Sequence, residues 1–179
     1  SGINNIAIGQ SSLISNQTGN DNISIGTNSS KDNTSGYDNI AIGTDSMRYN
    51  TDSYQNVAIG RESLYSLQST GGLRGNVAIG YQAGYSNDNR LNVFIGYQAG
   101  YYETGQSKLH IANNSSTTLI YGDFNQGIVG INTTGATNAL HVYSASNPVR
   151  FEGLQSSANT RWLTSNSDGV ITYTSAPVT

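Results

Sequence analysis

One short motif recurs along the first part of the chain: Asn, then Ile or Val, a middle residue, Ile and Gly. Six copies begin at Asn5, Asn22, Asn39, Asn56, Asn76 and Asn92, and a degenerate seventh copy is Lys108-Leu109-His110-Ile111-Ala112. The first apolar residues of the copies stand at positions 6, 23, 40, 57, 77, 93 and 109, so the copies follow each other at a short and nearly constant spacing. A coil this short has no room for a βαβ unit. It predicts a two-stranded rung of a parallel β-roll, a β-solenoid whose rungs stack about 4.8 Å apart.

The two faces of each short strand carry different side chains. Ile or Val occupies the first and third apolar positions, which share a face because side chains alternate along a strand. We expect this large apolar face to line the inside of the roll. The middle positions form a column of small residues that ends in a large one: Ala7, Ser24, Ala41, Ala58, Ala78 and Phe94. We expect this column to pack between chains around a three-fold axis, with Phe94 plugging its end; the alternative is that small residues only ease the stacking of rungs.

Composition restricts the class of protein. Only 35% of the residues are hydrophobic and 11% are charged, which is compatible with disorder or with a repetitive β-structure. The strict order of the apolar residues favours the second. Eight basic residues in a chain of net charge -3 argue against a nucleic-acid partner. No apolar run approaches the roughly 20 residues of a membrane-spanning helix, so no membrane insertion is expected. The absence of cysteine excludes disulfides and thiol chemistry.

The chain is expected to be all-β and to contain three parts. Residues 1–112 form the repeat array of about seven rungs, residues 113–143 a β-rich transition, and residues 144–179 a last β-rich segment with a hairpin across 165–169. In the transition, strands are expected at 117–121, 127–131 and 139–143. No window has the period and caps of a helix.

Candidate chemical groups are few. Asp45 and Asp52 are the nearest approach to a carboxylate pair, and solvated loop acids are the favoured interpretation because a glycosidase needs two carboxyls about 5 to 10 Å apart in a cleft. His110 and His141 each lie in an expected strand. Three copies of an inward histidine around an axis would make a metal or anion site, but an ordinary hydrogen-bonded histidine is favoured. The sequence therefore predicts no catalytic residue, no metal and no cofactor.

Tyrosines recur at the repeat spacing. Tyr81 and Tyr97 are separated by one repeat length, as are Tyr85 and Tyr101. Residues one rung apart should stack into ladders. Such a stripe is a candidate receptor-facing surface for a sugar or a protein, since tyrosine offers both apolar area and a hydroxyl. The alternative is that the rings only replace missing aliphatic packing.

The copies resemble known fibre proteins. Asn56-Val57-Ala58-Ile59-Gly60, with Ser63 three residues on, is similar to the head repeats of trimeric autotransporter adhesins, although those repeats are usually shorter. Segments 76–84 and 92–100 resemble the repeats of tail fibres of tailed bacteriophages and prophages. The later stretches also look like those fibres: 119–124, 129–131, 139–142, 148–154, 163–164 and 169–173.

The resemblance to tail fibres implies a parallel homotrimer, a rigid spacer at the virion surface or otherwise extracellular. Its implied partners are other fibre or tail proteins and a host cell-surface glycan or protein. A cleaved chaperone domain often follows in that family. Two alternatives remain open at this point: the head or stalk of a bacterial trimeric surface adhesin and, as a weaker one, a polysaccharide depolymerase spike.

Overall fold

The computed structural model describes residues 2–67, 74–145, 161–165 and 171–175. The chain divides into two compact units, Ser1–Ser146 and Asn147–Thr179. In the second unit, β11 (Arg161–Ser165) pairs antiparallel with β12 (Ile171–Ser175). The expected hairpin is therefore confirmed for its two strands, while its turn lies outside the described residues.

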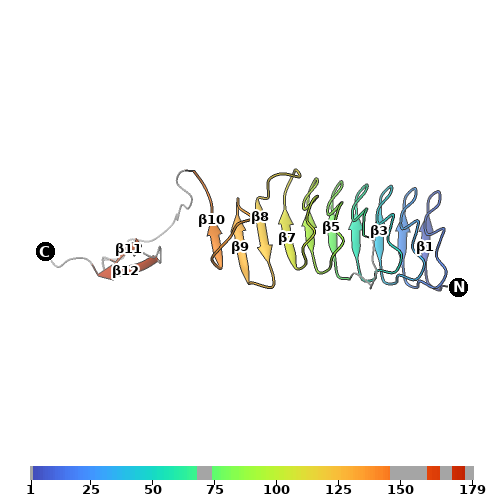
Figure 1. Cartoon of the computed structure of the whole chain (residues 1–179), viewed down its shortest axis with the longest axis horizontal. Coiled ribbons are helices and arrows are strands. Elements are labelled where there is room, and N and C mark those ends of the chain that lie inside the picture. Colours follow the sequence, from blue (N-terminus) through green and yellow to red (C-terminus); the bar gives the residue numbers. More distant parts are fainter. Residues whose placement is uncertain (1, 68–73, 146–160, 166–170, 176–179) are drawn as a thin grey trace. The chain divides into compact units, whose positions relative to one another are not determined.

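The first unit is built on one ten-stranded sheet whose strands follow each other in chain order (Figure 1). These strands are β1 (Ile6–Ile8), β2 (Ile23–Ile25), β3 (Ile40–Ile42), β4 (Val57–Ile59), β5 (Val77–Ile79), β6 (Val93–Ile95), β7 (Lys108–Ile111), β8 (Ile120–Asp123), β9 (Ile128–Ile131) and β10 (Leu140–Val142). From β1 to β7 all pairs are parallel, and each repeat copy lies directly beside the next. No described residue is helical, so the described part of the chain is all-β, and its first unit is a β-solenoid, as expected.

Each repeat coil contains a single short strand rather than the expected two. The rest of the coil is a succession of turns whose backbone groups bond to the next coil, as in Leu13 N–H to Ser29 C=O at 3.1 Å. These turns contain residues in the left-handed region, such as Met47 and Leu64 with φ of 49° and 47°, and such residues interrupt an extended strand. The glycine after each strand is required by space as well as by φ. A Cβ on Gly43, at φ 131°, would lie 2.5 Å from the carbonyl oxygen of Gly60.

The inside of the solenoid is occupied by the small middle column and not by the Ile/Val face. Ser24, Ala41, Ala58, Ala78 and Phe94 are completely buried within a single chain, whereas Ala7 on the first coil is exposed. On the flanking positions, Ile and Val are half-buried or exposed in every coil. The prediction of an Ile/Val interior is wrong. Each coil contains few residues, so the space it encloses is narrow. On the strand side this space admits mainly small side chains, because larger side chains from the opposite side of the coil fill the rest.

The same burial corrects the prediction of packing between chains. A side chain with no accessible surface in one chain cannot form a contact surface for another. Ser24, Ala41, Ala58, Ala78 and Phe94 therefore do not form such a surface in this fold. The predicted plug of three Phe94 rings is wrong for the same reason, since its own chain encloses the ring.

The lumen is filled by complementary sizes. Where the middle residue is Ala41 or Ala58, the far wall of the coil carries Met47 or Leu64, both fully buried. Beside Phe94 the equivalent far-wall positions are glycines: Gly100 in the same coil and Gly84 in the preceding coil, whose middle residue is Ala78. A Cβ on Gly84 or Gly100 would lie 2.5 or 2.2 Å from the Phe94 ring. The ring thus takes the space that aliphatic side chains fill in earlier coils.

The asparagine that begins each copy forms a buried polar ladder. The side-chain oxygen of Asn39 accepts the backbone N–H of Asn56 at 3.1 Å and its side-chain amide at 3.2 Å. Its own amide donates to the Ser53 carbonyl at 2.8 Å. The ladder ends at Asn92, whose oxygen accepts the backbone N–H of Lys108 at 2.8 Å. These bonds satisfy backbone groups that the coil buries beside its strand.

Beyond β7 the chain reverses direction. β8 pairs antiparallel with β7 and with β9, and β10 returns to a parallel pairing with β9. β8 begins at Ile120, later than the expected start at position 117. Asn114 holds the preceding turn, because its side-chain oxygen accepts the N–H groups of Ser116 and Thr117 at 2.8 and 2.7 Å.

Candidate functional site

An aliphatic strip covers the outer face of the sheet. Paired registers place two columns of residues side by side along all ten strands. The first column is Ile6, Ile23, Ile40, Val57, Val77, Val93, Leu109, Gly122, Val129 and Leu140. The second is Ile8, Ile25, Ile42, Ile59, Ile79, Ile95, Ile111, Ile120, Ile131 and Val142. Gly122 is the one position that is not aliphatic, and neither column contains a charged or polar side chain.

The strip is long and accessible to solvent. Nine steps of about 4.8 Å between strands give it a length of about 43 Å. Ile59, Ile79 and Ile95 in its middle expose 36, 40 and 39% of their surface. Monomeric proteins rarely leave a continuous apolar patch larger than a few hundred Å² uncovered. The strip therefore has the character of a contact surface.

The tyrosines stack from coil to coil, as the spacing predicts. The rings of Tyr81 and Tyr97 are 5.1 Å apart, and those of Tyr85 and Tyr101 are 4.8 Å apart and nearly parallel. The second ladder extends back to Tyr65, stacked on Tyr85 at 4.8 Å. Burial raises the pKa of Tyr85 and of Tyr101 above the ordinary value. A receptor role for these four tyrosines stays a prediction. Stacking covers part of the ring faces that a ligand would contact.

A hydrogen-bonded cluster closes the end of the solenoid. His110, which takes the middle position of the seventh copy, is buried between the rings of Phe94 and Tyr121. Its Nε2 lies 2.9 Å from Oε2 of Glu103, and its Nδ1 lies 2.9 Å from the hydroxyl of Thr118. A carboxylate only accepts hydrogen bonds, so Nε2–H donates to Glu103, and Nδ1 is hydrogen-bonded to the Thr118 hydroxyl. The hydrogen bond from His110 holds the pKa of Glu103 below its ordinary value, although burial opposes this.

An ion pair ties the reversed strand to the last coil. Lys108 on β7 and Asp123 on β8 are register partners, with Nζ and Oδ2 2.5 Å apart. Asp123 also accepts the N–H groups of Asn125 and Gln126, which fixes the turn after β8. The pairing lowers the pKa of Asp123 and raises that of Lys108.

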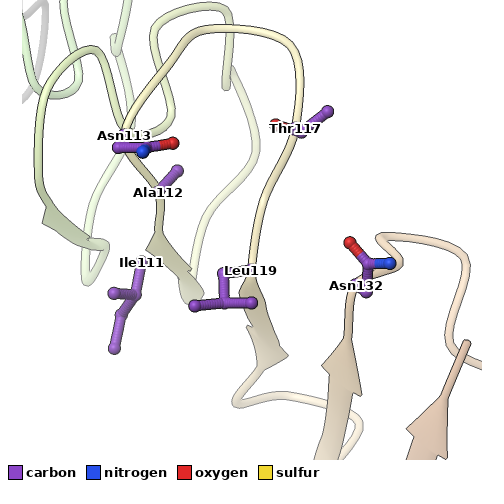
Figure 2. A pocket seen from close by; sticks show the side chains of 6 residues that line it. All are labelled: Ile111, Ala112, Asn113, Thr117, Leu119 and Asn132. Carbon is purple, nitrogen blue, oxygen red and sulfur yellow. The ribbon is translucent and has the colours of Figure 1, made fainter. Parts of the chain in front are cut away.

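Three cavities surround the loop between β7 and β8. The largest of these, about 420 Å³, is lined by Ile111 at the end of β7, by Ala112, Asn113 and Thr117 of the following loop, and by Leu119 and Asn132 (Figure 2). Ile111 belongs to the aliphatic strip and Leu119 is 60% exposed beside it. This cavity therefore continues the apolar face.

The other two cavities adjoin each other and are polar. One, about 250 Å³, is lined by Tyr101, Tyr102, Glu103 and His110 and by residues of the loop. The second, about 290 Å³, extends toward Tyr143. Both share the side chains of Ser116, Thr118 and Thr134. We call the two together the hydroxyl trough.

The remaining predicted residues are not brought together into a site. Asp45 forms an ion pair with Arg48 at 2.7 Å, and Asp52 accepts a hydrogen bond from the Thr51 hydroxyl. The two carboxylates share no partner. His141 is half-buried in β10, and its Nδ1 has no hydrogen-bond partner among the described residues. Within the described ranges no three His, Cys, Asp or Glu side chains are grouped for a metal. Nor do those ranges contain a helix of the length and apolarity that a membrane span requires.

Sequence reasoning missed the hydroxyl trough and the Glu103–His110 pair. The one available signal was the polar residue His110 at the middle position of the seventh copy, where the repeat degenerates. Comparison with family models, with curated protein sequences and with solved structures gave no match.

Proposed function

We propose that this chain is a structural segment of a fibre, a rigid spacer that assembles as a parallel homotrimer through its aliphatic strip. The single observation that carries the proposal is the strip itself, which is uncharged over ten strands and uncovered in one chain. Burial of apolar surface is worth about 25 cal/mol per Å². A surface of this length offers enough apolar area for stable association.

Identical chains are the natural partners for a strip with this period. A parallel copy presents the same aliphatic pair at the same rung spacing, so that contacts made at one rung repeat at each of the others. Around a three-fold axis each strip is covered by two neighbours. The choice of three chains is supported by the likeness of Asn56 to Gly60 and of segments 76–84 and 92–100 to the repeats of trimeric fibres.

The likeness of those segments supports a tail-fibre setting, with the segment at a virion surface and contributing to attachment to a host cell. The alternative, a bacterial surface adhesin, would use the same assembly. The proposed role requires no catalysis, and in the described part of the repeat coils Asp45 and Asp52 do not form the carboxylate pair that a depolymerase would need.

The assembly is tested by light scattering on the parent chain and on three variants of one coil. The parent should have a mass near three times 19.0 kDa. Ile42→Asp places a charge in the strip and should yield single, folded chains. Ala41→Asp buries an unpaired charge in the lumen and should unfold the coil itself. Thr44→Asp, at an exposed position next to the strand, is the matched control and should remain trimeric.

Two results would contradict the proposal. A parent chain that stays monomeric at micromolar concentration would refute assembly. An Ile42→Asp variant that keeps the parent mass would show that chains associate through some other surface.

A further inference from the structure

We infer that the hydroxyl trough at the end of the solenoid is a binding site for a short neutral glycan. Two adjoining clefts, of about 250 and 290 Å³, share one rim. Sites for drug-sized ligands occupy about 300–1,000 Å³ each. Each cleft is therefore of a size for a single sugar ring, and the pair for a disaccharide unit.

Each cleft has an exposed aromatic ring at its outer end. Tyr102 is 71% exposed in the first cleft, and Tyr143 is 58% exposed in the second. Tyr102 makes a T-shaped contact with Tyr101, at 4.6 Å and 66°, and is not stacked within the ladder. The C–H face of a pyranose packs on such a ring, while the phenol hydroxyl offers a hydrogen bond.

The shared rim supplies hydrogen-bonding groups that the fold does not use. Ser116 and Thr134 line both clefts, and their hydroxyls make no hydrogen bond to another described residue. The hydroxyl of Ser115, which lines the first cleft, also makes no hydrogen bond to another described residue. Hydroxyls that both donate and accept match the hydroxyls of a sugar.

The charge of the trough selects against acidic sugars. Glu103 lines the first cleft, and neither cleft is lined by a lysine or an arginine. The hydrogen bonds from His110 and from the Gly105 N–H keep this carboxylate ionised and in place. A uronate or sialic acid would therefore meet a like charge, whereas a neutral hexose or N-acetylhexosamine would find an additional acceptor.

The trough exists because the repeat ends here. In the array, each coil covers the one before it. After β7 the loop 112–119 turns back into an antiparallel strand, so no further coil covers Tyr101, Tyr102 and Glu103. The site is formed by one chain and does not require the trimer. Its role, which would be to bind a neutral glycan during attachment to a host cell, rests on the proposed function.

Saturation-transfer NMR on the full chain tests the site with methyl glycosides of glucose, galactose and N-acetylglucosamine. The sugars are used at about 10 mM, which fills a site with Kd near 1 mM. At least one neutral glycoside should receive saturation, and glucuronic acid should receive less. Tyr102→Ala should weaken binding about tenfold. Tyr97→Ala removes another exposed ring, one that lies outside the trough, and should leave binding unchanged.

The outcomes separate this inference from the proposed assembly. A trimer by light scattering that binds no neutral glycoside overturns the site and leaves the fibre proposal intact. A monomer that binds neutral glycosides in the expected way overturns the proposed assembly and leaves the site intact. Binding that survives Tyr102→Ala, or that is lost in Tyr97→Ala, overturns the location of the site.

Discussion

Replacing Phe94 by alanine and then refilling the space from the opposite wall tests how the lumen is packed. Phe94 is fully buried, and its ring occupies the space beside Gly84 and Gly100. Phe94→Ala should lower the free energy of unfolding by about 3–5 kcal/mol, the usual cost of a large buried ring and the cavity it leaves. Gly84→Leu alone should also destabilise the chain, since its Cβ would lie 2.5 Å from the ring.

The double variant should be more stable than Phe94→Ala alone. A leucine at residue 84 would copy Leu64, which occupies the equivalent position one coil earlier with φ 47° and full burial. The side chain refills the cavity, and what remains is the cost of a left-handed backbone, about 1–2 kcal/mol. We therefore expect the double variant to lose about 1–2 kcal/mol relative to the parent, with a strong favourable coupling between the two sites.

Equilibrium denaturation at one fixed chain concentration measures these differences. Gly127→Leu is the matched control: its φ of 66° is close to the 60° of Gly84, but a Cβ there has nothing within 4 Å. Combined with Phe94→Ala, the control should add its own cost and restore nothing. If Phe94→Ala/Gly84→Leu is instead as unstable as the sum of its single variants, the two positions do not share one space and the size argument fails.

Two further predictions concern polar groups. Asn39→Ala removes the acceptor of the buried Asn56 N–H and the donor to the Ser53 carbonyl. The free energy of unfolding should fall by about 1–3 kcal/mol for each group left unsatisfied. An unchanged denaturation midpoint would contradict the ladder. Glu103 and Asp123 have pKa values lowered from 4.5 and 3.8, so the stability they contribute is present above those values and is lost as the pH falls through their lower folded values. Near-UV circular dichroism should therefore show loosening around β7 to β9 in strong acid, and Glu103→Gln should reduce that pH dependence.

The repeat predicted the fold and its register, but not which face is inside. Period-two alternation tells which residues share a face, and the choice of the Ile/Val face as interior relied on the rule that large apolar side chains are buried. In so short a coil the lumen is too narrow for that rule. Tyr85 and Tyr101 were predicted to stack because stacking needs only the repeat length. The trough was not predictable, because Tyr102, Ser116 and Thr134 meet only through the reversal of β8.

The strands after the array give independent support for an outer role of the aliphatic strip. If Ile and Val were outside only because the lumen is narrow, the pattern should lapse where the regular lumen ends. The middle column does change, from small residues to Phe94, His110 and Tyr121, and then to Gly130 and His141. The second outer column does not: Ile111, Ile120, Ile131 and Val142 continue it through two antiparallel pairings and one parallel pairing, while the first column is interrupted only at Gly122. The outer face thus stays aliphatic, apart from Gly122, while strand direction and interior both change, and this supports the proposed association along the strip.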